Sequence, residues 1–178
     1  MPTARELVER ANRARRENRL ADARRDLTEA VAFLRQAGAP PELALALKAL
    51  GQAERDLGHG EAALLLYEEA AVIYRRTADP LALAHTVRHV GDIHRGAGRP
   101  ALAAPCYHEA LTLYRGDAAT DPLDLANALR PLAILEEAAG NAEAAAGLWR
   151  EARDLYARAN VAEGVAECSA RLDRNGRS

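Results

Sequence analysis

Apolar residues recur along the chain at the spacing of an α-helix. Leu43, Leu47 and Leu50 follow one another at intervals of four and three residues, and the same spacing returns at Leu125 and Leu129. Such intervals place the side chains on one face of a helix, whereas a half-buried strand would alternate at every second residue. The pattern therefore predicts amphipathic helices.

These helices belong to a repeat. Residues 50–74, 90–114 and 132–156 align without a gap. The second interval is slightly longer than the first, and its extra residues fall in the connector 116–122. The aligned columns hold small or aromatic residues: Gly51, Gly91 and Ala133; Gly58, Gly98 and Gly140; Ala63, Ala103 and Ala145; Tyr67, Tyr107 and Trp149; and Ala70, Ala110 and Ala152. An insertion confined to one connector is typical of stacked helical hairpins.

The repeat extends to both ends in weaker form. The same offset taken backwards from Gly58 gives a degenerate first copy with Asn18 at the turn, and the last residues match only the first helix of another copy. Glycine readily takes the left-handed conformation that ends a helix, so Gly58, Gly98 and Gly140 mark the turns inside the hairpins. We expect a single domain, 1–178, with hairpins at about 4–38, 42–78, 82–116 and 124–158 and a capping helix at about 161–174.

The columns resemble the tetratricopeptide repeat (TPR), whose signature is a small residue, an alanine, a large aromatic residue and a second alanine in this order. The spacing is longer than that of the usual repeat, and in this it is similar to the long variety found in kinesin light chains and bacterial regulators. This chain departs from the family in lacking the tryptophan usual near the start of the first helix. The resemblance implies an all-α, right-handed superhelical solenoid of antiparallel helical hairpins.

The resemblance also implies that the first helix of each hairpin lines a concave groove. The polar residues expected to face it are Lys48, Gln52, Arg55, His85, Arg88, His89, Asp92, Arg95, Asn127 and Arg130, and the same columns hold Asn12 and Arg15 in the first copy. Guanidinium and amide donors match carboxylate oxygens, so an extended acidic segment or a C-terminal carboxylate of a protein or peptide partner is the expected ligand. The alternative is that these arginines are ordinary solvated helix residues.

Three of the five histidines lie close together, between residues 85 and 95. His85, His89 and Asp92 share one helical stripe, a set that could hold a metal ion with an open fourth position. The neighbouring arginines disfavour a cation, and the glutamate of the HExxH motif is absent. A small-molecule or metal-dependent enzyme with its site here is the second hypothesis, whereas His94 is expected to face its own hairpin and to form a hydrogen bond there.

Composition and charge exclude several classes of function. The formal net charge of −2 argues against a general nucleic-acid binder, and Cys106 and Cys168 share no short metal-binding spacing. The sequence offers neither a signal peptide nor an apolar run long enough to span a membrane. We expect a cytoplasmic binding protein with no catalytic residues and no cofactor, and the abundance of alanine and arginine indicates a bacterial source. A third hypothesis is a homodimerisation module of a bacterial regulator.

Overall fold

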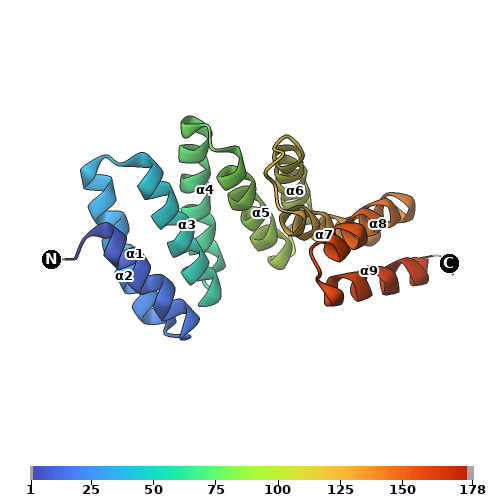
Figure 1. Ribbon diagram of the computed structural model, residues 1–178, viewed down its shortest axis with the longest axis horizontal. Helices are drawn as coiled ribbons and strands as arrows, with labels where there is room; N and C mark the ends of the chain where they lie inside the picture. The colour runs from blue at the N-terminus through green and yellow to red at the C-terminus, as the bar shows by residue number, and fades with distance from the viewer. Residues whose placement is uncertain (1, 176–178) are drawn as a thin grey trace. The chain divides into compact units, whose positions relative to one another are not determined.

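The computed structural model describes residues 2–175 (Figure 1). Within this range the chain forms nine α-helices and no strand: α1 (Ala4–Arg16), α2 (Leu20–Ala37), α3 (Pro40–Asp56), α4 (Gly60–Thr77), α5 (Pro80–Gly96), α6 (Pro100–Arg115), α7 (Pro122–Ala138), α8 (Ala142–Arg158) and α9 (Ala162–Asn175). None of these helices is both long and apolar enough to cross a membrane. The expectation of an all-α fold is confirmed.

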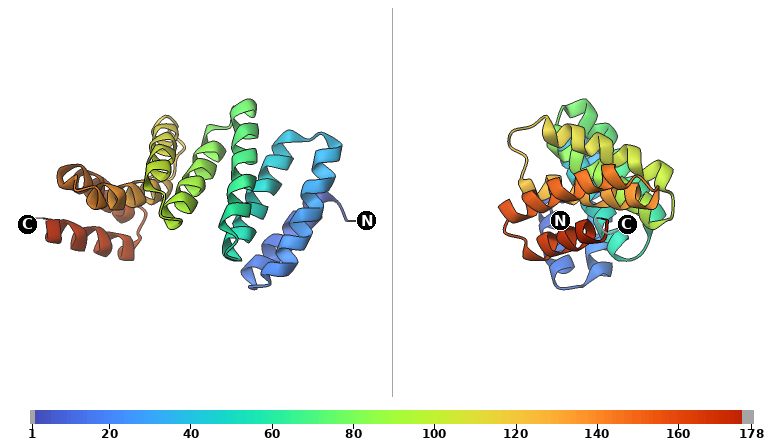
Figure 2. Two further views of the ribbon diagram at one scale, coloured as in Figure 1. Left: turned by 180° about the vertical axis from the view of Figure 1, so that it is seen from behind. Right: turned by 90° about the vertical axis from the view of Figure 1, so that its right-hand side faces the viewer.

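The chain falls into two compact units, one running up to Ile93 and the other beginning at His94, so that the boundary lies within α5. In the first unit α1 packs on α2, α2 on α3 and α3 on α4, and α1 also contacts α3. In the second unit α6 packs on α7, α7 on α8 and α8 on α9 (Figure 2). Within each unit these helices thus pack mainly on their neighbours in sequence, as expected for helical hairpins.

The turns inside the hairpins are formed by residues in the left-handed conformation. Gly58, Gly98 and Gly140 have φ angles of 84°, 68° and 81°, which confirms the turns predicted at these positions. In the degenerate first copy Asn18 takes the same conformation, with φ of 56°. Asparagine tolerates this region better than most residues, because its short polar side chain can form local hydrogen bonds.

The small and aromatic columns form the core. Tyr67, Tyr107 and Trp149 have no exposed surface, and Leu27 takes the same buried place in the first copy. The alanines that are likewise fully buried around them are Ala23, Ala30, Ala63, Ala70, Ala103, Ala110, Ala145 and Ala152. A Cβ atom added at Gly51 would lie 3.2 Å from the ring of Tyr67, so the aromatic side chain rests directly on the backbone of the preceding helix. The core therefore depends on small residues that let helices approach closely.

Aspartate and proline open two of the hairpins. α5 begins at Pro80 and α7 at Pro122, where the missing N–H of proline would have had no partner in the helix. The carboxylate of Asp121 accepts a hydrogen bond from the backbone N–H of Leu123, and Asp79 accepts one from a backbone N–H of α5. These side chains cap the helix N-termini.

The last helix packs on the hairpin before it. α9 contacts α8, and the buried Gly164 lies against Tyr156 so closely that an added Cβ atom would be 2.5 Å from the ring. Cys168 of α9 is fully buried, and burial raises the pKa of its thiol to about 11. This helix therefore covers the end of the second unit's core.

Candidate functional site

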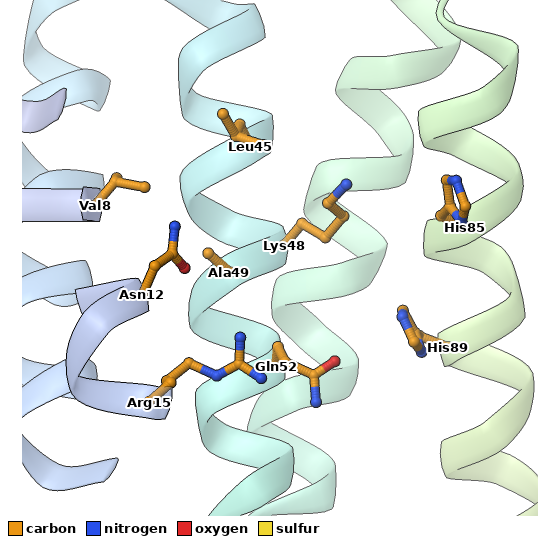
Figure 3. Close-up of a pocket in the computed structure, with 9 residues that line it drawn as sticks. All are labelled: Val8, Asn12, Arg15, Leu45, Lys48, Ala49, Gln52, His85 and His89. Carbon is orange, nitrogen blue, oxygen red and sulfur yellow. The ribbon is translucent and has the colours of Figure 1, made fainter. Parts of the chain in front are cut away.

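The first helices of three successive hairpins line one pocket in the first unit (Figure 3). The pocket has a volume of about 360 Å³. We call it the groove pocket, and its lining residues are Val8, Asn12 and Arg15 of α1, Leu45, Lys48, Ala49 and Gln52 of α3, and His85 and His89 of α5. Six residues of the predicted groove columns are brought together here: Asn12, Arg15, Lys48, Gln52, His85 and His89.

Sequence reasoning missed the apolar part of this lining. Val8, Leu45 and Ala49 escape a prediction that considers only polar residues as ligand contacts. The repeat itself carries the signal that finds them, since each lies one repeat before a predicted residue, as Val8 does before Lys48. Side chains at equivalent positions of successive hairpins face the same way in a repeat fold.

A second pocket adjoins the groove pocket. This apolar pocket, of about 350 Å³, shares Val8 and Leu45 with the groove pocket and adds Ala4 and Leu34. Its lining also includes the charged residues Arg5, Glu9 and Glu42. Leu45 is 51% exposed, although it is a large hydrophobic residue. A hollow with exposed leucine at its wall is a favourable place for an apolar group of a ligand.

Lys48 is the only lysine in the chain, and it lies in the groove pocket. Within residues 2–175 no carboxylate oxygen lies within 4.0 Å of its Nζ atom. The Nζ atom is 5.9 Å from the centre of the Tyr74 ring, a distance typical of a cation–π contact. Burial lowers the pKa of Lys48, and the charge of Asp79 opposes this effect. In Figure 3 the side chain extends from α3 toward α5. It therefore presents a positive charge to the pocket.

Three arginines expected in the groove of the first unit, Arg15, Arg55 and Arg88, lie close to carboxylates of the chain itself. Arg15 lies 2.8 Å from Asp56, and Arg88 lies 3.2 Å from Asp92. Arg55 is 3.8 Å from the same oxygen of Asp92. In this unit the arginines expected to face the groove therefore form ion pairs. Lys48 differs from them because no carboxylate oxygen of residues 2–175 lies within 4.0 Å of its Nζ atom.

His89 completes this polar network. Its ring stacks on Tyr67, with centroids 5.3 Å apart, and its Nδ1 atom lies 3.0 Å from a guanidinium nitrogen of Arg55. Burial lowers the pKa of His89 to about 4, although a hydrogen bond with Asp92 opposes the shift. The Tyr67 hydroxyl donates to Gln52 at 3.4 Å, and burial raises the pKa of this tyrosine to about 12. The side chains of His89 and Tyr67 are therefore neutral at physiological pH.

The stripe of His85, His89 and Asp92 does not have the arrangement of a metal site. The Oδ2 atom of Asp92 lies 3.5 Å from Nδ1 of His89 and faces the guanidinium groups described above. Among residues 2–175 no group of three or more His, Cys, Asp or Glu side chains could hold a metal ion. Arginine supplies the positive charge beside Asp92 that a metal ion would otherwise supply.

Two further residues of the predicted groove lie in the second unit, where they bind other side chains. Arg130 donates to both carboxylate oxygens of Glu167, at 2.7 and 2.9 Å, and this bond ties α7 to α9. The side-chain oxygen of Asn127 accepts a hydrogen bond of 3.0 Å from Tyr156. Glu167 was not predicted as a partner, because the capping helix has no complete repeat with which to compare it.

The end of α5 carries the remaining predicted residues. His94 is buried, with 9% of its surface exposed, as expected for a residue facing its own hairpin. The hydrogen bond expected for it is missing at Nδ1, which has no partner among the described residues. Arg95 lies 3.4 Å from the hydroxyl group of Tyr107. Arg95 thus contacts the core aromatic of its own hairpin.

Solved structures of helical repeat proteins are similar to this one. BtubC (BKLC) from P. vanneervenii superposes with a TM-score of 0.81 over 88% of this chain and 64% of its own, at 20% identity. A putative kinesin light chain from Podospora anserina with nearly identical TPR-like repeats gives a TM-score of 0.77 over 97% of this chain and 85% of its own, at 16% identity. The chain has the fold of a TPR-like helical repeat protein. The resemblance found in the sequence is confirmed.

Two further solved structures share the same fold. Aspartyl phosphate phosphatase F from Bacillus subtilis and the apo form of RapI each give a TM-score of 0.84 over 93% of this chain, at 12% and 14% identity. The chain spans 43% and 60% of their lengths, and 64% of the length of BtubC. No protein-family model matches the TPR-like chain, and no curated protein matches it in sequence. At these identities the likeness concerns the fold alone.

Proposed function

We propose that this TPR-like chain is a cytoplasmic protein-binding scaffold, with the groove pocket as its binding face and an extended acidic or carboxylate-bearing segment as its ligand. The observation that carries the proposal is the position of Lys48. The only lysine of the chain stands in a pocket lined by three successive hairpins, and no carboxylate of the described residues neutralises it at close range. A carboxylate of a partner would fill that role.

The rest of the pocket suits a peptide. Asn12 and Gln52 offer side-chain amides on neighbouring helices, and such groups can bond to the backbone of an extended segment as well as to a carboxylate. The ion pairs Arg15–Asp56 and Arg55–Asp92 join α1 to α3 and α3 to α5. A pre-organised floor of this kind lowers the cost of ordering the protein when a ligand binds.

We propose no catalytic activity for the chain itself. The nine residues that line the groove pocket include no serine, threonine, cysteine, aspartate or glutamate (Figure 3). Hydroxyl, thiol and carboxylate nucleophiles, which serve acyl and phosphoryl transfer, are therefore not offered by the lining. One of the similar solved structures is that of an aspartyl phosphate phosphatase, but its likeness to this chain is one of fold at 12% identity.

Affinity capture with charge-reversed variants tests the proposal. Immobilised native chain, Lys48→Glu and Arg76→Glu would be incubated with cytosol of the source organism, and the bound proteins quantified by mass spectrometry. Arg76 is the matched control, because it is exposed on α4 and lies outside the groove pocket. We expect a partner that the native chain and Arg76→Glu retain equally and that Lys48→Glu loses by about tenfold or more, since reversal of a contacting charge costs several kcal/mol. Equal retention by Lys48→Glu would refute the binding face.

A further inference from the structure

The groove pocket and the apolar pocket adjoin each other. They share Val8 and Leu45, one from each of two neighbouring helices, so a single ligand can enter both. Leu45, which belongs to both linings, is half exposed. The two pockets therefore set joint requirements on one bound segment.

The pockets are displaced from each other along the helix axes. On α3 the apolar pocket spans residues 42 to 45 and the groove pocket spans 45 to 52, while on α1 the spans are 4 to 9 and 8 to 15. On both helices the midpoints lie about five residues apart, which corresponds to about 7.5 Å at the rise of an α-helix. In an extended peptide, side chains at positions i and i+2 point the same way and lie about 7 Å apart. The displacement thus fits two same-face side chains.

The two pockets differ in charge. The cations Arg15 and Lys48 line the groove pocket, and Arg55 and Arg88 lie next to the neutral ring of His89. Asp56 and Asp92 are the carboxylates paired with these arginines. The apolar pocket holds one cation and two carboxylates: Arg5 against Glu9 and Glu42. An acidic side chain is therefore attracted to the groove pocket and repelled by the apolar pocket.

From this arrangement we infer that the bound segment is an extended peptide with an apolar side chain two residues away from an aspartate or glutamate. The apolar side chain occupies the pocket of Val8 and Leu45, and the acidic side chain faces Lys48. The inference rests on the proposed function and specifies its ligand. A site defined by charge alone would bind any acidic segment. Two adjoining pockets also select the spacing between the apolar and the acidic side chain.

Selection from a random peptide library tests this spacing. A displayed library of heptapeptides would be selected on the immobilised full chain, and enriched peptides would be remade for fluorescence anisotropy. We expect enriched sequences with an apolar residue two positions from an acidic one. Moving the acidic residue by one position, or replacing the apolar residue with serine, should each weaken binding by about tenfold or more, because one pocket is then left unfilled.

A pair of leucine variants provides the control on the protein side. Leu45→Asp should lose the selected peptides, whereas Leu65→Asp should keep them, because Leu65 is 69% exposed on α4 and lines neither pocket. Peptides that need Lys48 but ignore the spacing and Leu45→Asp would overturn the inference and leave the proposed function standing. A selection that enriches no peptide, or only peptides that bind Lys48→Glu equally well, would overturn both.

Discussion

Two glycines of the second unit should respond in opposite ways to alanine. Gly140 has φ of 81° in the turn between α7 and α8, where a Cβ atom costs about 1–2 kcal/mol. Gly147 is exposed within α8 with open space around it, so alanine there should add about 0.5–1 kcal/mol of stability. We expect urea unfolding to show that Gly140→Ala is less stable than the native chain and Gly147→Ala more stable. Equal effects would contradict the turn geometry.

The lowered pKa of His89 predicts how the free energy of unfolding depends on pH. A histidine in the unfolded chain titrates near 6.5, whereas the pKa of buried His89 is about 4. Between these values the unfolded state binds one more proton, so the free energy of unfolding falls as the pH is lowered from about 6.5 to about 4, by at most about 1.4 kcal/mol per pH unit. His89→Gln should reduce this slope.

Exposed His108 gives the matched comparison for this titration. Urea midpoints measured between pH 4 and pH 7 should show the native slope in His108→Gln and a shallower one in His89→Gln. If His89→Gln retains the full native slope, then burial of His89 is not the source of the acid sensitivity.

For single residues, the sequence predicted which side chains are buried better than it predicted which side chains form ion pairs. The burial of Tyr67 followed from its column, because every copy of the repeat places that side chain in the same environment. The pairing of Arg88 with Asp92, by contrast, depends on which rotamers the neighbouring side chains leave open. Lys48 could have been noticed as the only lysine, but its lack of a close carboxylate required the structure.

At the scale of helices, close approach through alanine is the main packing device. Ala63 has no exposed surface, whereas its neighbour Ala62 is exposed on the same helix, α4. Ala63→Leu should therefore destabilise the chain by about 1–3 kcal/mol through overpacking, and Ala62→Leu should have little effect. Thermal unfolding followed by circular dichroism checks this. A leucine at position 63 that is tolerated as well as one at position 62 would mean that the helices can separate without loss.

The helices could be predicted closely because their signals are local. The first-copy turn at Asn18 and the start of α7 at Pro122 follow from residues that either favour a left-handed turn or fit a helix start. The division of the chain within α5 was not predicted, since the continuous repeat favours a single domain. Nothing in the repeat pattern marks Ile93 as different from its equivalents, because such a boundary depends on how many contacts cross it.

For the whole molecule, the repeat predicts which side chains belong together and leaves their chemistry to the structure. The repeat offset relates Val8 to Lys48 and Leu45 to His85, and all four line the groove pocket. The apolar pocket beside it was not predicted, because it also uses Leu34 of a second helix. The sequence therefore predicts which repeat positions form a binding face built from several hairpins, but it does not predict the shape of that face.

A partner that covers Lys48 should protect its amine from chemical modification. The variant Arg76→Lys supplies a second, exposed lysine outside the groove pocket as an internal reference. Both lysines would be acylated with N-hydroxysuccinimidyl acetate, with and without the captured partner, and the rates measured by peptide mass spectrometry. At a partner concentration ten times its Kd, we expect acylation of Lys48 to slow by about tenfold while the reference lysine reacts unchanged. A bound partner that leaves the rate at Lys48 unaltered would show that Lys48 lies outside the binding face.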